Sequence, residues 1–274
     1  MAAEILTNLE FSDYRAIPAV NWSLLRLYGH SPAHYRLAAD APPTPPTPAC
    51  LLGQAVHALT LEGEAAYLER FAVAPEGIDR RTKAGREAWA TFQDQAAGRD
   101  VLTADQAAAV QGMAEAIGRS RTANKLLARC TVRESTVIWT DPVTGTPCKA
   151  RPDAMDPTSG LLLDLKSTSD ATLDAIRKDV ARRLYHGQLA FYRRGIAATG
   201  HPAAPCVLVF VESTPPHGVR CVVLDDEALG AGDNLADRLL QLHAECERTG
   251  TWPGYADRVE ALTLPPWVTR EATA

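Results

Sequence analysis

Residues 147–168 read PCKARPDAMDPTSGLLLDLKST, and this stretch decides the fold. The segment 161–166 is almost wholly apolar, and 147–154 has the composition of a strand. The residues between them, 156–160, read DPTSG, which is turn chemistry. The stretch therefore predicts two strands joined by a turn.

Three polar side chains on these strands form a candidate site. Residues i and i+2 of a strand project from the same face, so Asp164 and Lys166 lie side by side while Leu165 points into the opposite layer. If the two strands pair across the turn, Asp153 comes within reach of Asp164. Two carboxylates suit a hard cation such as Mg²⁺ or Mn²⁺, and a nearby lysine suits phosphodiester hydrolysis.

The Asp-x-Lys triplet identifies nothing by itself, because such triplets are common. Asp153, Asp164 and Lys166 could simply satisfy one another as ion pairs at the end of a strand. The context favours a site, because Ser167 and Thr168 follow directly and their hydroxyls could bond a phosphate.

The rest of the chain predicts an α/β fold with a central mixed sheet flanked by helices and a mostly helical N-terminal part. Further strands are expected over 132–140, 207–211 and 219–224. Helical patterns cover 22–28, 51–68, 86–95, 103–127, 171–198 and 227–248, and one begins at Ser31-Pro32.

Residues 41–48 read APPTPPTP, a proline-dense stretch that neither continues a helix nor joins a central strand. It is interpreted as a connector, with a docking site for a partner as the alternative. The predicted organisation is an N-terminal helical arm with the proline-rich connector (1–49), a catalytic domain (50–256) and a C-terminal tail (257–274).

Composition limits the classes of function. The 274 residues carry a formal net charge of −5, unlike a protein that holds nucleic acid by bulk electrostatics, so any positive charge that binds DNA has to be local. No apolar run approaches the length of a membrane helix, which predicts a cytoplasmic protein with no membrane contact. The six cysteines are scattered, so neither a metal cluster nor structural disulfides are expected.

The order of several motifs resembles the PD-(D/E)XK nuclease superfamily, in its RecB-like branch. In chain order they are Gly53-x-x-x-His57, Glu134, Pro152-Asp153, Asp164-x-Lys166 and Gln188-x-x-x-Tyr192. From residue 22 to residue 255 the chain is most similar to phage and prophage exonucleases of the exonuclease VIII (RecE) type. The cysteine pattern of the iron–sulfur subfamilies and the helicase motifs are absent from the sequence.

The resemblance implies roles for individual positions. The metal ligands would be His57, Asp153, Asp164 and the backbone carbonyl of Leu165, with Glu134 as a weaker candidate. Three further residues would act at the reaction centre: Lys166, Gln188 and Tyr192. A packing role remains the alternative for the histidine, glutamine and tyrosine, and a solvated surface role for the glutamate.

A set of basic and hydroxyl side chains is expected to contact DNA. It comprises Arg151, Ser167, Thr168, Lys178, Arg182, Arg183, Arg193 and Arg194. The basic residues from 178 to 194 surround the Gln-x-x-x-Tyr helix, and an ordinary charged helix face is the alternative reading.

The resemblance implies a divalent-metal-dependent exodeoxyribonuclease that resects double-stranded DNA ends 5′ to 3′. It also implies a homo-oligomer and a single-strand annealing protein as partner. An endonuclease of the same superfamily and a catalytically inactive DNA-binding scaffold are the alternatives.

Overall fold

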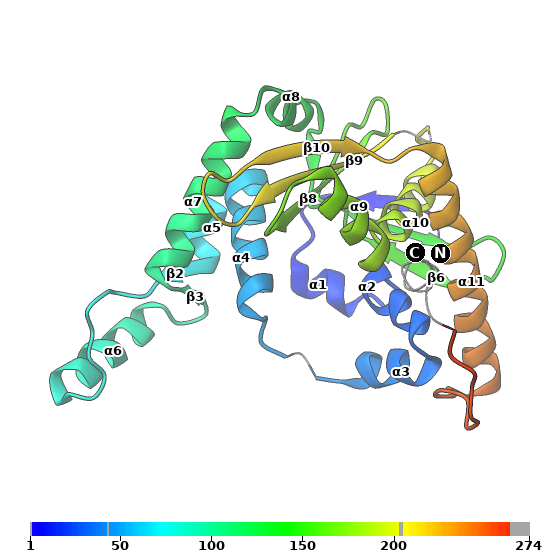
Figure 1. The fold of residues 1–274 in the computed structure, drawn as a ribbon, viewed down its shortest axis with the longest axis horizontal. Helices are drawn as coiled ribbons and strands as arrows, with labels where there is room; N and C mark the ends of the chain where they lie inside the picture. The colour runs from blue at the N-terminus through cyan, green and yellow to red at the C-terminus, as the bar shows by residue number, and fades with distance from the viewer. Residues whose placement is uncertain (1, 43, 203–204, 264–274) are drawn as a thin grey trace, which may run out of the picture.

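The computed structural model describes residues 2–42, 44–202 and 205–263, and a five-stranded mixed sheet lies at its centre (Figure 1). The strand order is β10 (Val219–Val223), β9 (Cys206–Glu212), β8 (Leu162–Thr168), β7 (Ala154–Met155) and β4 (Val132–Arg133). Strands β8 and β9 run parallel, and the other pairs are antiparallel. The predicted α/β fold is confirmed.

The central strands are buried on both faces because their apolar side chains alternate between two cores. Leu162 of β8 lies in one core, and Leu163 and Leu165 lie in the other. In β9, Leu208 and Phe210 repeat the first set. Asp164 and Lys166 consequently share the face of the first core, as the sequence predicts.

The first core is covered by helices and by a small antiparallel sheet. Figure 1 shows α10 and α11 on the side opposite α4 and α7. The elements on this side are α9 (Leu173–Arg182), α10 (Tyr185–Ala198), α11 (Asp226–Thr249), β1 (Glu4–Leu6), β5 (Thr136–Thr140) and β6 (Pro147–Ala150). Helix α10 packs on both α11 and the small sheet, so its side chains reach the central strands.

The second core is covered by helices from the first half of the chain. They are α4 (Pro48–His57), the π-helical turn η2 (Ala58–Glu62), α5 (Glu64–Arg70), α7 (Ala104–Arg119) and α8 (Arg121–Arg129). Helix α4 contacts β8, and its last residue is His57. This packing carries the histidine to the central sheet from the face opposite α10.

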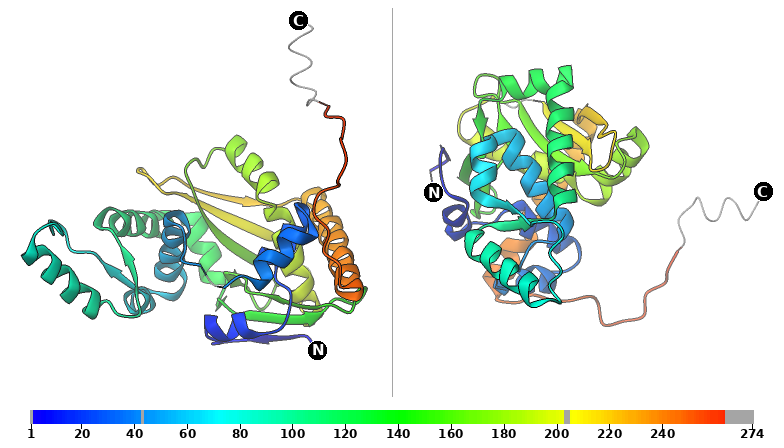
Figure 2. Two further views of the ribbon diagram at one scale, coloured as in Figure 1. Left: turned by 90° about the horizontal axis from the view of Figure 1, so that it is seen from below. Right: turned by 90° about the vertical axis from the view of Figure 1, so that its left-hand side faces the viewer.

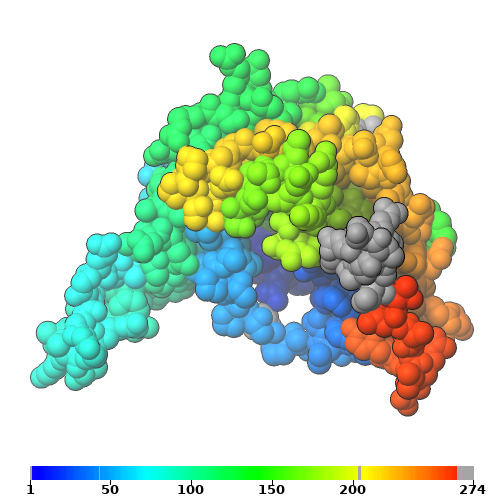
Figure 3. All heavy atoms as spheres, viewed as in Figure 1, coloured from blue at the N-terminus to red at the C-terminus, as the bar shows by residue number. Residues whose placement is uncertain are grey.

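An arm projects from this helical layer (Figures 1, 2 and 3). It consists of the parallel pair β2 (Phe71–Val73) and β3 (Asp100–Leu102) and of α6 (Lys83–Gln95). No residue of α6 is buried, and its Trp89 ring lies 4.5 Å from the guanidinium of Arg80. Helix α6 stands away from the central sheet, while Phe71 and Leu102 at the base of the arm are buried in the second core.

The N-terminal segment packs against the first core. After β1 it forms α1 (Phe11–Ala16), α2 (Trp22–Leu25), the 3₁₀ turn η1 (Arg26–Gly29) and α3 (Pro32–Asp40). Trp22 and Leu25 are buried in that core, and Val20 bridges to Cys148 of β6. The division of the chain at residue 49 stays a prediction.

Lys149 of β6 fastens this segment to the small sheet. Its side chain is buried, and Nζ donates to the carbonyl oxygens of Tyr14, Arg15 and Ile17 at 2.8, 3.1 and 2.7 Å. These carbonyls lie at the C-terminal end of α1, where a cation is favoured.

We expect Lys149→Met to lower the free energy of unfolding by roughly 2–4 kcal/mol, because three acceptors lose a charged donor. Urea unfolding followed by circular dichroism measures the change. Lys125→Met, at an exposed position of α8, is the matched control and should shift stability by less than about 0.5 kcal/mol. Equal stability of the two variants would contradict the role given to Lys149.

Five segments that the sequence predicts as continuous are interrupted. The strand over 147–154 is divided between β6 and β7, which lie in different sheets. The helix over 51–68 is interrupted at Gly63, which has φ 97°. The strand over 132–140 is divided between β4 and β5 in different sheets, because Glu134 has a left-handed backbone with φ 46°. The helix over 103–127 ends at Ser120, whose side chain caps α8 instead. The helix over 171–198 is broken at Leu184, also left-handed with φ 58°.

The remaining strand and helix predictions agree with the structure within a few residues. The closing helix α11 ends at Gly250, which has φ 66°, as the sequence predicts. The short strands β1, β2 and β3 have no signal in the sequence, since three residues are too few to show a period.

Four of the six cysteines are buried: Cys130, Cys148, Cys206 and Cys246. Burial of this kind is typical of cysteines that pack as small apolar residues, while Cys50 is exposed. Among the helices of the described ranges, none combines the length and hydrophobicity that crossing a membrane requires.

Candidate active site

The site forms where β7 ends and one edge of β8 becomes open. Strand β7 pairs with β8 only through Ala154 with Leu163 and Met155 with Leu162. Beyond Leu163, the backbone groups on that edge need other partners. Leu165 N–H donates to Asp153 Oδ2 at 2.6 Å, and Leu165 O lies 2.7 Å from His57 Nε2.

On the neighbouring face of β8, Asp164 and Lys166 form a buried ion pair between Asp164 Oδ2 and Lys166 Nζ. The Asp164 side chain is 1% exposed and that of Lys166 16%. Burial opposes the charge on Lys166, but Asp164 and Asp153 outweigh it and raise the pKa of the lysine. The Tyr185 ring lies 4.7 Å from Nζ, which adds a cation–π contact.

Helix α10 supplies the second side of this pair. Gln188 Nε2 lies 3.4 Å from Asp164 Oδ1 and donates to the Tyr192 hydroxyl at 2.9 Å. Burial and the nearby Asp164 carboxylate raise the pKa of Tyr192 well above its usual value, so it remains a neutral phenol. Gln188 and Tyr192 are one turn apart on one helix face, as the sequence predicts, and that face meets Asp164.

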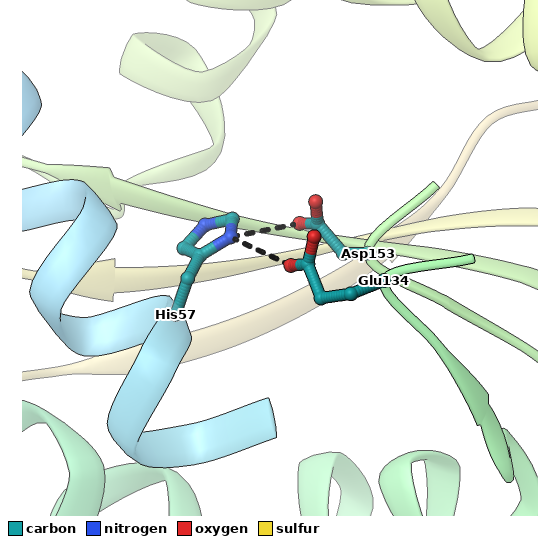
Figure 4. Close-up of side chains that lie close together, drawn as sticks. All are labelled: His57, Glu134 and Asp153. Carbon is teal, nitrogen blue, oxygen red and sulfur yellow. Dashed lines mark ion pairs between the residues drawn. The ribbon is translucent and has the colours of Figure 1, made fainter. Parts of the chain in front are cut away.

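His57 points from the last turn of α4 toward the carboxylates of Asp153 and Glu134 (Figure 4). Its Nδ1 lies 3.5 Å from Asp153 Oδ2 and 3.9 Å from Glu134 Oε1. Burial alone would lower the pKa of His57, but the two carboxylates raise it to about 9. The family resemblance of the sequence implies all three residues as candidate ligands, and folding brings them together from segments far apart in the chain.

Asp153 connects the His57 group with the Asp164–Lys166 pair. Burial, together with the charge on Asp164, raises the pKa of Asp153 to about 7. The ionised form of this carboxyl group is therefore disfavoured at its position until a cation is close. An acid held in this way marks a place where positive charge is favourable.

Glu134 reaches the site because of its backbone conformation. The sequence predicts Glu134 within a strand. In the structure it lies at the left-handed bend between β4 and β5. Such a conformation is rare for a glutamate and is held here by neighbouring contacts. Arg151 Nε donates to Glu134 Oε2 at 3.2 Å. Burial raises the pKa of Glu134, but the nearby His57 and Arg151 outweigh it and lower that pKa.

The donor atoms of His57, Glu134 and Asp153 all lie within 4.8 Å of one another. One imidazole nitrogen and two carboxylate oxygens suit Mn²⁺ well and Mg²⁺ acceptably. These residues therefore fit a divalent cation. Asp164 is not in this group, and its carboxylate oxygens contact Lys166 and Gln188. The Leu165 carbonyl faces the imidazole of His57.

Gly53 is not sterically required for the approach of α4 to β8. A Cβ at that position would lie 3.6 Å from Ser167 Oγ, an ordinary van der Waals distance. The approach of α4 to β8 is therefore set by the surrounding apolar contacts and not by the glycine.

Three of the arginines predicted to contact DNA are used within the protein. Arg194 binds Asp233 and Asp237 of α11 at 2.7 and 2.5 Å, and Arg193 lies 3.3 Å from Asp233. Arg151 is occupied by Glu134 and by the Leu9 carbonyl. These partners compete with a phosphate for the three side chains, and the contact of these arginines with DNA stays a prediction.

We expect Arg194→Gln to lower the free energy of unfolding by about 1–3 kcal/mol, because Asp233 and Asp237 lose their shared cation in a partly buried place. Affinity for DNA should stay within twofold. Thermal unfolding and fluorescence anisotropy measure the two quantities. An unchanged melting temperature with weakened DNA binding would contradict the structural role and support the predicted contact of Arg194 with DNA.

The other predicted DNA contacts differ in their surroundings. Thr168 Oγ1 bonds the backbone of Asp170 in a local turn, and Ser167 lies beside α4. Three basic residues of α9 and its C-terminal end are exposed: Lys178, Arg182 and Arg183. Asp179 pairs with both arginines. This exposed surface remains open to a phosphate backbone.

Sequence reasoning does not single out Tyr185, whose ring contacts Lys166. A signal is available, since Tyr185 precedes Gln188 by three residues on a helix and therefore shares its face. No comparable signal places Trp22 and Arg26 of the N-terminal segment near α10, because only the tertiary fold brings α2 there.

Comparisons with known proteins agree with this geometry. A family model described as a PDDEXK-like domain of unknown function (DUF3799) matches residues 22–265. Among solved structures, a protein from Eubacterium rectale described as a "putative exonuclease" has a similar fold, with a TM-score of 0.59 and 13% sequence identity over 96% of this chain and 96% of that chain. At that identity the likeness concerns the fold alone. A search of the curated proteins found no match.

Proposed function

Because the chain belongs to the DUF3799 family of PDDEXK-like domains, we propose that it is a divalent-metal-dependent deoxyribonuclease that cleaves DNA from its ends. The observation that carries the proposal is the buried Asp164–Lys166 pair beside Asp153, on the open edge of β8. Two acids and one lysine at a strand edge, next to a histidine, form a hydrolytic centre for a phosphodiester.

We propose His57, Asp153 and Glu134 as metal ligands, with Asp164 and the Leu165 carbonyl completing the set. The side chains of the first three residues already converge, and Asp153 interacts with both His57 and Asp164. When bound, Mg²⁺ or Mn²⁺ would polarise the scissile phosphate and activate water.

The remaining residues act on the phosphate and on the reacting water. Lys166 would neutralise the charge that builds on the phosphate oxygens, or orient the attacking water. Gln188 orients Asp164 and would help Tyr192 position the DNA strand. In the hydrolysis one water is consumed and one P–O bond is broken, leaving a phosphate and a hydroxyl end.

The finer proposal is an exonuclease of the RecE type that resects double-stranded ends 5′ to 3′ in phage-type recombination. It rests on the order of the sequence motifs and on the description of the Eubacterium rectale protein as an exonuclease. A homo-oligomer and a single-strand annealing protein as partner belong to the same proposal.

Nucleotide release from DNA tests the activity. Purified protein is incubated with linear duplex or with intact circular plasmid, in Mg²⁺, in Mn²⁺ or in EDTA. An exonuclease degrades only the linear DNA, and only with metal. Cutting of the circle would identify an endonuclease, and tight DNA binding without cleavage in either metal would identify an inactive scaffold.

A further inference from the structure

A cavity of about 440 Å³ lies between α3, the C-terminal half of α11 and the turn that joins β5 to β6. Figure 2 shows α3 next to α11, with the hairpin of β5 and β6 reaching the same helix. Its volume falls within the roughly 300–1,000 Å³ that is usual for ligand pockets. None of the residues assigned to the candidate active site lines it, so a ligand held here is separate from the reaction centre.

Two aromatic side chains form one wall of the cavity. Tyr35 of α3 and His243 of α11 are both buried, and their rings meet edge to face with centroids 5.2 Å apart. Burial lowers the pKa of His243, so its ring adds no positive charge near neutral pH. Apolar surface from Val20 and Pro147 continues the lining. Aromatic and apolar walls of this kind are typical of sites for organic cations.

Glu247 supplies a carboxylate to the same cavity. It is exposed and makes no ion pair within the described ranges, since the adjacent Arg248 pairs with Glu245 instead. Burial, together with the charge on Glu247, raises the pKa of Tyr35 to about 12, which places this carboxylate near the phenol. Glu247 also lies in the last turn of α11, where the helix dipole favours a cation.

The opposite wall is formed by the turn between β5 and β6, and it also lacks positive charge. The N–H and the hydroxyl of Thr144 both donate to Asp141 Oδ2 at 2.8 Å, and Thr146 Oγ1 lies 2.9 Å from Thr144 Oγ1. Asp141 is buried, so a second carboxylate stands behind these hydroxyls. Among the described residues that line the cavity there is no lysine or arginine. The charge of the cavity is therefore negative on two sides.

We propose that this cavity binds an organic cation, an ammonium or guanidinium group carried on an aliphatic chain. The chain lies against Tyr35, Val20 and Pro147, and the cation meets Glu247. An inorganic ion alone would leave most of the volume unfilled. Two sources present this chemistry: a free diamine and the lysine or arginine side chain of a polypeptide. The proposal does not depend on the proposed nuclease function.

Nuclear magnetic resonance of the His243 ring tests the site without DNA. Protein that is isotope-labelled in histidine is titrated at constant pH and ionic strength with 1,4-diaminobutane, with the tripeptide Ac-Gly-Arg-Gly-amide or with the uncharged Ac-Gly-Gln-Gly-amide. The His243 resonance is the one that disappears in His243→Gln. Both cations are expected to shift it in a saturable way, with Kd of about 1 mM or below, and the uncharged tripeptide should not.

Substitution of Glu247 tests the charge. Glu247→Gln is expected to raise Kd about fivefold or more, because the cation loses its carboxylate, and Glu247→Lys should abolish saturation. The position is exposed, so both variants should melt within about 2 °C of the wild type. Glu69→Gln is the matched control, since Glu69 is an exposed glutamate on α5, and it should leave Kd within about twofold.

The two cations distinguish the source of the ligand. Tighter binding of the diamine supports a free amine, and tighter binding of the arginine tripeptide supports a side chain of a polypeptide. Three results overturn the site: no saturable shift with either cation at millimolar concentrations, an equal response to the uncharged tripeptide, or an unchanged Kd in Glu247→Gln. DNA takes no part in these measurements, so they stand or fail independently of the nuclease activity.

Discussion

Lys166→Met is expected to lower the rate of DNA cleavage by about 10²–10³-fold or more, the effect of losing one preorganised charge at a reaction centre. The methionine keeps the length and apolar stem of the side chain but removes the ammonium beside Asp164. Binding of DNA should change much less than kcat, because the charge acts mainly on the phosphate as it reacts. Single-turnover cleavage of linear duplex in Mn²⁺, with Kd measured separately, separates the two quantities.

The Lys166→Met variant leaves the Asp164 carboxylate buried without its cation, and this can destabilise the fold by itself. Lys166→Arg is therefore measured beside it. That variant keeps a positive charge and should melt within about 3 °C of the wild type, yet its planar fork does not replace a compact ammonium. Cleavage should remain at least tenfold reduced. Lys125→Met, exposed on α8, should cleave at the wild-type rate.

Either of two results would contradict this role for Lys166. One is cleavage by Lys166→Met within about threefold of the wild type. The other is a loss of cleavage that follows the fraction of unfolded protein in each variant. The second result would leave Lys166 as a stabilising partner of Asp164 and nothing more.

Mn²⁺ is expected to raise the melting temperature of the wild-type protein, and Asp153→Asn should abolish this increase. A ligand at 100 times its Kd stabilises the folded state by about 2.7 kcal/mol, which corresponds to roughly 5–10 °C for a chain of this size. Asp153 is the carboxylate between His57 and Asp164, so its charge is required by any cation held there. Differential scanning fluorimetry with and without Mn²⁺ measures the shift.

In EDTA, Asp153→Asn should melt within about 2 °C of the wild type, or higher. The asparagine Oδ1 can still accept from Leu165 N–H, and the neutral amide no longer repels Asp164. Loss of metal response without loss of stability would separate a ligand from a structural residue. Cleavage in Mn²⁺ should fall about 10³-fold, since the metal contributes several kcal/mol to the barrier.

Asp94→Asn, at an exposed position of α6, is the control for Asp153 and should keep the full Mn²⁺ shift. A full shift in Asp153→Asn would remove Asp153 from the ligand set. A wild-type protein that does not respond to Mn²⁺ or Mg²⁺ at millimolar concentration would overturn the metal site as a whole.

Several parts of the site follow from the sequence because they depend on local geometry. The two-residue period of a strand places Asp164 and Lys166 on one face and Leu165 on the other. The helical period places Gln188 and Tyr192 on one face of α10. Each relation holds within a single strand or helix, so it does not depend on how the rest of the chain folds.

Other parts of the site depend on a single backbone angle that composition does not encode. The positive φ of Glu134 ends β4 and turns its carboxylate toward His57, and the same feature at Leu184 separates α9 from α10. The intrinsic backbone preferences of glutamate and leucine do not favour a positive φ at either position. Surrounding contacts impose them, as Arg151 does at Glu134.

Charge is the property that the sequence represents least well. Arg193 and Arg194 occur in a basic run of sequence, yet their partners are aspartates of α11, some forty residues later. A run of like charges in the sequence does not make a positive surface when a packed neighbour carries the opposite charge. Arg26, which has no basic neighbour in sequence, is instead brought next to Arg183 by folding.

The sequence by itself therefore determined the α/β class, the strand carrying Asp164 and Lys166, and the helix face of Gln188 and Tyr192, because periodicity is local. The tertiary structure alone decided the rest. The short β7 leaves one edge of β8 open, and the backbone groups of Leu165 there contact Asp153, from the loop before β7, and His57, from α4. Contacts of this kind depend on where strands end and on which helices cover them, and no spacing along the chain records either.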